Sequence, residues 1–137
     1  MPYLLDTNVV SETRKRNCDP NVRAWIASVP GDELHISVLV LGEIRGGIER
    51  LRRRDPTQAD VLERWLLSLA RDFADRTLAV DAAIADEWGR LNVPDPLPAI
   101  DGLSVATARA HNLTLVTRNV RDVERTHVRM FNPFEPR

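Results

Sequence analysis

Short apolar runs alternate along this chain with longer segments of helical periodicity, and that alternation constrains the fold more than any other feature. The short runs cover residues 3–5, 34–37, 77–80, 113–117 and 128–131. Each run has the length of a strand, and the first one stops at the acidic residue Asp6. Strands that are separated by helices predict a parallel sheet, because a parallel connection needs a crossover long enough to contain a helix.

The segments between the short runs carry apolar residues at the three- and four-residue spacing of amphipathic helices. Helices are predicted for residues 21–29, 38–51, 56–73, 83–91 and 100–111, with a short helical turn over residues 119–125. Asp19-Pro20 and Asp55-Pro56 each combine a helix cap with a proline at the first helical position, which is a typical start signal. We therefore expect an α/β fold with a single domain over residues 1–137, in which a parallel sheet of four to five strands has helices on both faces.

Composition excludes several classes of protein. The chain has 137 residues, of which 43% are hydrophobic, and its formal net charge is -1. This apolar content argues against disorder, and a nucleic-acid coat protein would normally carry a clear basic excess. Cys18 is the only cysteine, which excludes an intramolecular disulfide and a cysteine-based zinc site. The N-terminus lacks the pattern of a secretory signal and no apolar run approaches the ~18 residues of a membrane span, so a cytoplasmic protein without a membrane partner is expected.

Acidic side chains stand at the ends of the predicted elements. Asp6 closes the first strand, Glu43 lies on the helix after the second, and Asp101 opens the helix that follows a proline-rich loop. Asn119 and Asp122 follow the fourth strand and share a face if that turn is helical. In a doubly wound parallel sheet, the carboxyl ends of the strands and the starts of the following helices lie at one edge, so these groups are expected to converge.

Each of these acids also has a purely structural interpretation. Asp6 can cap the turn that follows it, Asp101 can cap its helix, and Glu43 can simply face solvent. Several carboxylates in one pocket repel one another, however, unless a cation neutralises them. A hard divalent ion does so, and Mg²⁺ or Mn²⁺ suits a site with few protein ligands. Such a site supports metal-assisted hydrolysis of a phosphodiester.

Several segments of the chain carry a family resemblance. They comprise residues 4–10 (Leu-Leu-Asp-Thr-Asn-Val-Val), 37–44, 100–101, 115–119 (Leu-Val-Thr-Arg-Asn) and 128–134. In this order they resemble the motifs of PIN-domain ribonucleases, in particular the VapC-like toxins of bacterial toxin–antitoxin pairs, FitB-like members among them. The resemblance spans essentially the whole chain. It implies a small parallel α/β domain that acts as a metal-dependent endoribonuclease with Mg²⁺ or Mn²⁺.

The resemblance also implies roles for particular residues. By motif position, Asp6, Glu43 and Asp101 match the acidic triad that holds the metal. At the fourth position many members have an aspartate where this chain has Asn119, and others rely on an acid a few residues on, which here is Asp122. An asparagine adds no charge, so the choice between these two residues, and between one metal and two, stays open. Three further side chains are expected as hydrogen-bonding partners in the same pocket, namely Thr7, Asn8 and Thr117.

Basic residues flank the predicted site. Arg14, Lys15 and Arg118 follow the acidic motifs and are the candidates for contacts with RNA phosphates. The arginines within residues 50–54 are either a solvated helix end or part of the same RNA surface. The resemblance further implies a homodimer and a cognate VapB-like antitoxin that covers the active site.

Two other classes of protein remain as alternatives. One is a catalytically weak or inactive PIN-like module that binds RNA or an antitoxin without cleaving RNA, an interpretation that Asn119 keeps open. The other is a receiver-like phospho-acceptor domain, since Asp81 follows the third predicted strand. A receiver would also need a pair of acids at the first strand and a lysine after the last, whereas Asp6 stands alone and Lys15 is the only lysine.

Overall fold

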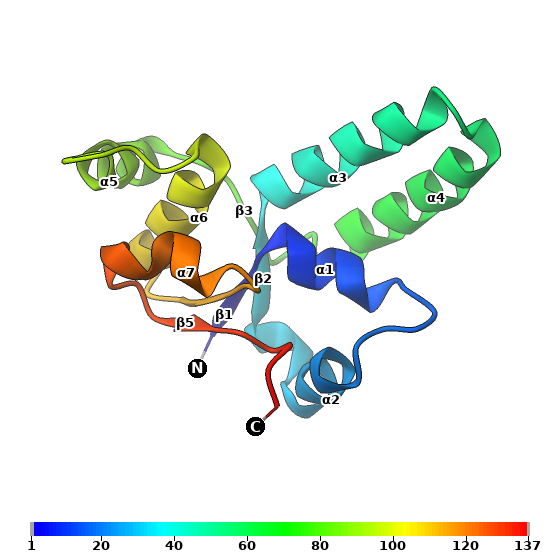
Figure 1. Ribbon diagram of the computed structural model, residues 1–137, viewed down its shortest axis with the longest axis horizontal. Coiled ribbons are helices and arrows are strands. Elements are labelled where there is room, and N and C mark those ends of the chain that lie inside the picture. The colour runs from blue at the N-terminus through cyan, green and yellow to red at the C-terminus, as the bar shows by residue number, and fades with distance from the viewer. Residues whose placement is uncertain (1, 137) are drawn as a thin grey trace.

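A wholly parallel five-stranded sheet forms the centre of the computed structural model, which describes residues 2–136. Its strands lie in the order β3-β2-β1-β4-β5 (Figure 1). The strand bounds are β1 (Tyr3–Leu5), β2 (Leu34–Ser37), β3 (Thr77–Leu78), β4 (Thr114–Val116) and β5 (Met130–Phe131). The strand order reverses at β1, and ligands of such sheets bind outside the carboxyl ends of the strands at that point.

Helices cover both faces of the sheet, as predicted (Figure 1). On one face lie α1 (Thr7–Thr13), α2 (Pro20–Ser28), α3 (Val38–Arg52) and α4 (Pro56–Asp72), and on the other lie α5 (Ala82–Leu91), α6 (Ala99–Ala110) and α7 (Val120–Val123). Short 3₁₀ turns span Gly31–Glu33 and Glu124–Thr126. None of the helices within residues 2–136 is long and apolar enough to cross a membrane.

The core is divided into two layers by the alternation of side chains along the strands. Leu5 and Val116 point into the layer beneath α1 to α4, whereas Leu4 and Leu115 point into the layer beneath α5 to α7. All four side chains are buried. Strands of a sheet that is covered on both faces must be apolar at every position, which explains why the sequence shows continuous apolar runs.

The two Asp-Pro pairs begin helices α2 and α4, as predicted. Asp19 Oδ1 accepts the N–H of Asn21 (2.8 Å) at the start of α2. Asp55 Oδ1 accepts the N–H of Gln58 (3.1 Å) at the start of α4. Each carboxylate satisfies a backbone donor that has no partner within its helix.

The structure differs from the sequence prediction most at α1. The pattern predicts no helix directly after Asp6, yet α1 begins at Thr7 with Asp6 as its cap. Tertiary packing explains the difference, because Val9 and Val10 are buried in the core. The strand predicted over residues 77–80 ends at Leu78, and the strand predicted over residues 128–131 begins only at Met130.

Helices α3 and α4 form a hairpin that extends beyond the sheet (Figure 1). Arg45 and Arg52 of α3 both donate to Glu63 Oε1 of α4, each at 2.7 Å. Arg52 also donates to Asp60 Oδ1 at 2.6 Å. Single exposed ion pairs contribute little to stability, but a network of them fixes the register of the two helices.

Candidate functional site

Asp6 occupies the carboxyl end of the central strand and is held there by hydrogen bonds. Its Oδ1 accepts the N–H of Thr7 (2.9 Å), as the cap of α1. Its Oδ2 accepts the hydroxyl of Thr117 (2.8 Å) and the amide of Asn8 (3.3 Å). Thr117 is itself buried, with 1% of its surface exposed. The orientation of the Asp6 carboxylate is therefore fixed from two strands.

The segments after β1 and β4 are joined by side-chain hydrogen bonds to the backbone. Asn8 Oδ1 accepts the N–H of Arg118 (3.2 Å), and its amide donates to the Thr117 hydroxyl (3.4 Å). The same hydroxyl accepts the N–H of Asn119 (3.1 Å). Thr117, Asn8 and Asp6 thus form one connected network, although more than a hundred residues separate the two segments in sequence.

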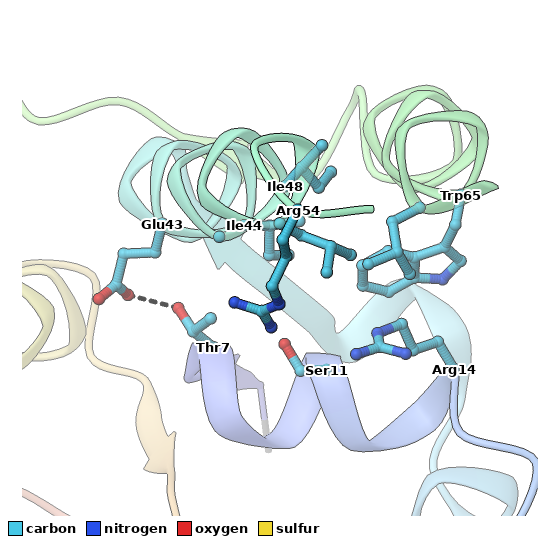
Figure 2. A pocket seen from close by; sticks show the side chains of 11 residues that line it. Thr7, Ser11, Arg14, Glu43, Ile44, Ile48, Arg54 and Trp65 are labelled. Carbon is cyan, nitrogen blue, oxygen red and sulfur yellow. Dashed lines mark hydrogen bonds between the residues drawn. The ribbon is translucent and has the colours of Figure 1, made fainter. Parts of the chain in front are cut away.

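Glu43 enters the site from α3 and is linked to α1. The hydroxyl of Thr7 donates to Glu43 Oε1 at 2.5 Å (Figure 2). Glu43 is exposed, as its place off the apolar face of α3 predicts. This contact connects the acid of α3 to the residue directly after Asp6.

Asp101 lies in the first turn of α6, where it is half-buried. Burial raises the pKa of its carboxyl group above the ordinary value, and the negative charges of Asp6, Asp122 and Glu43 raise it further. A helix N-terminus favours a negative charge, so the direction of the shift means that burial and the neighbouring acids outweigh the helix dipole. The four carboxylates therefore lie close enough to act on one another electrostatically.

The acids of the site are linked by the effect of their charges on Asp101 and not by direct contact. Within residues 2–136, no group of three or more His, Cys, Asp or Glu side chains is arranged so that it could hold a metal ion. The oxygens of Asp6 and Glu43 are turned toward hydroxyl and backbone donors. The donor set still has the chemistry of a hard-cation site, because it consists of carboxylate oxygens and the raised pKa of Asp101 reflects a local excess of negative charge.

The structure distinguishes the two candidates for the fourth position. Asp122 lies in α7 and contributes to the raised pKa of Asp101. Asn119 precedes α7, is exposed, and uses its N–H on Thr117 and its carbonyl oxygen on the N–H of Asp122 (3.1 Å). Asp122 is thus the residue of the two that adds charge to the cluster.

The three basic candidates lie in different surroundings. Lys15 forms an ion pair with Glu12 (3.1 Å). The Arg118 guanidinium stacks 4.4 Å from the ring centroid of Phe134. Arg14 lines a pocket between α1, α3 and α4, and the wall of this pocket also includes Thr7 and Glu43 (Figure 2). Only Arg14 among the three therefore lines a cavity that is continuous with the acidic cluster.

That pocket, with a volume of about 270 Å³, also contains Trp65, which sequence reasoning missed, and Arg54, which it left as part of a solvated helix end or of the RNA surface. Trp65 was one member of an apolar helical stripe, and Arg54 was one arginine in a cluster. No sequence signal separates them from their neighbours, because their position depends on how α3 packs against α4. Arg52, from the same cluster, is engaged with Glu49, Asp60 and Glu63.

The carboxylate of Asp81, on which the phospho-acceptor alternative depends, serves as a helix cap. Asp81 Oδ1 accepts the N–H of Ile84 (3.0 Å) and caps α5. A capping carboxylate explains the position of Asp81 without any chemistry. It is also absent from the charges that raise the pKa of Asp101.

Comparisons with known proteins identify the family of the chain. The PIN domain matches residues 3–127. Toxin FitB of Neisseria gonorrhoeae is 30% identical, covering 96% of this chain and 97% of that protein. VapC ribonuclease Y4jK of Sinorhizobium fredii is 30% identical, covering 97% of this chain and 98% of that protein. The crystal structure of FitAcB from Neisseria gonorrhoeae matches with a TM-score of 0.89 at 30% identity, covering 98% of this chain and 99% of its counterpart. The chain therefore belongs to the PIN-domain family.

Proposed function

We propose that this chain is an endoribonuclease toxin that hydrolyses RNA phosphodiester bonds at the carboxyl edge of its sheet with the help of Mg²⁺ or Mn²⁺. The observation that carries the proposal is that the charges of Asp6, Asp122 and Glu43 all act on Asp101, whose pKa is raised first by burial and then by these charges. Charges from three separate segments act on the Asp101 carboxyl group only where they lie close to it. Support also comes from the names of relatives, one a toxin and one a ribonuclease.

Each acid has a distinct role in this proposal. Asp6, Glu43 and Asp101 would hold the metal, and Asp122 would add the fourth negative charge. When bound, the metal supplies positive charge that stabilises the phosphate in the transition state. The hydroxyls of Thr117 and Thr7 hold the carboxylates of Asp6 and Glu43, which would have to turn toward Asp101 to bind the cation together with it.

The direct test is cleavage of a panel of RNAs by the purified chain with Mg²⁺, Mn²⁺ or EDTA. Cleavage is expected only with metal, and Asp101→Asn is expected to reduce it at least a hundredfold. Asp86→Asn is the matched control, because Asp86 is an exposed helical aspartate that pairs only with Arg90 among the described residues. Cleavage in EDTA, or equal loss in both variants, would contradict the mechanism.

The non-catalytic alternative makes a different prediction in the same experiment. A module that only binds RNA would retard RNA in a gel without shortening it, with or without metal. Asn119 and the absence of a ready three-ligand group within residues 2–136 are the observations that favour it. Metal-dependent cleavage that is lost in Asp101→Asn would exclude it.

The proposal includes a cognate VapB-like antitoxin and a homodimer as partners. The support is the similarity to Toxin FitB and to the FitAcB structure. We expect expression of the chain in bacterial cells to arrest growth and expression of Asp101→Asn to permit it. Sedimentation of the purified chain is expected to give the mass of two copies of the 15.5 kDa chain. Sedimentation as a single copy would contradict the homodimer.

A further inference from the structure

The pocket between α1, α3 and α4 has two contrasting sides. Its floor is apolar and includes Ile44 and Ile48, both buried. Its mouth is formed by two exposed guanidinium groups, those of Arg14 and Arg54, and by the indole of Trp65. Figure 2 shows both arginine side chains directed into the pocket from opposite sides, toward the hydroxyl of Ser11; Arg14 directly follows α1, and Arg54 lies in the turn between α3 and α4.

The two arginines are not neutralised by the protein. Elsewhere on the same helical hairpin, Arg45 and Arg52 are paired with carboxylates. For Arg14 and Arg54, by contrast, no carboxylate among residues 2–136 lies within ion-pair distance. Two like charges directed into one space repel each other unless an anion lies between them. Their arrangement therefore fits a phosphate group, which guanidinium donors bind well.

Trp65 adds a flat aromatic surface beside these charges. The guanidinium carbon of Arg14 lies 5.9 Å from the centroid of the Trp65 ring. Bases of single-stranded nucleic acids stack on aromatic side chains and on arginine planes, without regard to sequence. A phosphate and a base are the two parts of one nucleotide, and the pocket offers one kind of contact for each.

The position of the pocket gives this nucleotide a place on the substrate. Glu43 belongs both to the pocket wall and to the acidic cluster, and its hydrogen-bond partner Thr7 also lines the pocket, so the pocket adjoins the cluster. We propose that Arg14, Arg54 and Trp65 form a subsite for a single-stranded nucleotide that flanks the bond to be cleaved, with the phosphate on the arginines and the base on the indole. This inference rests on the proposed function, because it assumes an RNA substrate.

The test measures RNA binding separately from cleavage. The full chain carrying Asp101→Asn is titrated against a short, labelled, single-stranded RNA of mixed sequence, and binding is followed by fluorescence anisotropy at several salt concentrations. Adding Arg54→Ala is expected to weaken binding roughly three- to tenfold and to reduce the salt slope by about 0.7, the value for one phosphate contact on a single strand. Arg14→Ala is expected to do the same.

Arg53→Ala is the matched control for the charge. Arg53 is the exposed neighbour of Arg54 on the same helix end, but it does not line the pocket. The Arg53→Ala substitution removes an equal charge from the same region, so its effect on RNA binding measures the general electrostatic attraction alone. If Arg53→Ala weakens binding as much as Arg54→Ala does, the arginines act only through their distant field and the subsite is wrong.

Trp65→Leu and Trp65→Phe test the stacking. Loss of one stacked base is expected to weaken binding about tenfold in the leucine variant, while the phenylalanine variant keeps most of the affinity. Thermal unfolding of both variants checks that the half-buried position is still folded. RNA affinity that is equal in both Trp65 variants and in the parent chain would overturn the subsite, and it would then favour a peptide as the occupant of the pocket.

The two proposals fail in different ways. RNA cleavage by the chain with natural Asp101, together with unchanged RNA binding in the Arg14, Arg54 and Trp65 variants, would refute the subsite and leave the ribonuclease standing. Binding that depends on these residues, without any cleavage, would refute the ribonuclease and leave only a nucleotide-binding pocket with no bond to be cleaved beside it.

Discussion

At the scale of single residues, Thr117 determines how firmly the central acid is held. Its buried hydroxyl donates to Asp6 Oδ2 (2.8 Å) and accepts the N–H of Asn119 (3.1 Å). Thr117→Val keeps the shape of the side chain and removes both of these hydrogen bonds, together with the one that the hydroxyl accepts from the amide of Asn8. A buried polar group that loses its partner costs about 1–3 kcal/mol. We expect urea denaturation to show a loss of that size, and RNA cleavage to fall because Asp6 is less constrained.

Thr117→Ser serves as the control for this prediction. Serine keeps the hydroxyl and removes only a methyl group, so cleavage is expected to stay near that of the parent chain. If the valine variant cleaves RNA as fast as the serine variant does, the hydroxyl has no part in positioning Asp6.

Glu12 provides a second prediction at this scale, which concerns pH. Its side chain is only 8% exposed; it accepts the N–H of Asp19 (2.8 Å) and forms an ion pair with Lys15. The hydrogen bond to the Asp19 backbone, followed by the one to Lys15, lowers the pKa of Glu12 below its ordinary value. Because the folded state favours the charged form, Glu12 stabilises the fold at neutral pH. That contribution is lost as the pH falls from about 4.3, the ordinary value, through the lower pKa of the folded state.

Glu12→Gln tests the sign of this effect. At pH 7 we expect the variant to lose about 1–2 kcal/mol of unfolding free energy relative to the parent chain. At pH 3 the difference is expected to shrink, since Glu12 is then largely protonated in the unfolded state. Urea denaturation at pH 7 and at pH 3 measures the difference in unfolding free energy between the two chains. A difference that stays constant with pH would contradict the role given to Glu12.

At the scale of elements, α1 shows where sequence reasoning stops. Its first residues, Thr7 to Ser11, include β-branched and short polar side chains that are poor helix formers. The helix forms because Asp6 caps it and because Val9 and Val10 pack in the core. The strands and the larger helices were predictable because their periodicity and capping agree with the fold, whereas α1 depends on contacts that the sequence does not display.

Gly102 carries a prediction that links two helices. It is buried in α6 directly after Asp101, and a Cβ placed on it would lie 3.0 Å from Trp88 Cδ1 and 3.1 Å from Trp88 Nε1 of α5. Gly102→Ala therefore forces the indole or the start of α6 to move. Overpacking of this kind costs about 1–3 kcal/mol. We expect lower thermal stability and, because Asp101 moves with the helix, slower RNA cleavage.

Gly89→Ala is the control on the neighbouring helix. Gly89 is exposed in α5, and a Cβ placed there meets nothing within 4 Å. Replacing a helical glycine by alanine in open space is expected to stabilise the protein by about 0.5–1 kcal/mol. If both variants change the melting temperature in the same direction, the close contact with Trp88 does not limit the packing of α5 on α6.

At the scale of the whole molecule, the parallel sheet explains why distant acids were predictable as a group. Asp6 and Asp101 stand at element ends, and the topology brings such ends to one edge without any detail of side-chain packing. The pocket was not predictable, since Arg54 and Trp65 meet only through the geometry of the α3–α4 hairpin. The near-zero net charge likewise conceals the separation of an acidic cluster from an unpaired arginine pair.

We expect that acidic cluster to make the stability of the molecule depend on metal. The pKa of Asp101 is raised in the folded state, so folding disfavours its charged form. The resulting destabilisation is complete at pH values above the raised pKa, and it disappears as the pH falls below about 3.9, the ordinary value of an aspartate. At neutral pH in EDTA, Asp101→Asn is therefore expected to unfold at a higher temperature than the parent chain.

A bound divalent cation is expected to reverse this order. Metal that binds only the folded state stabilises it by about 2.7 kcal/mol at a hundredfold excess over Kd, enough to raise the melting temperature of the parent chain by several degrees. Asp101→Asn lacks one of the proposed ligands, so Mn²⁺ is expected to raise its melting temperature much less. Scanning calorimetry of both chains, in EDTA and in Mn²⁺ at pH 7, measures the crossing. If Mn²⁺ raises the melting temperatures of both chains equally, it binds at a site that does not include Asp101. Only at a site that includes Asp101 does the substitution remove both the charge repulsion and the metal binding.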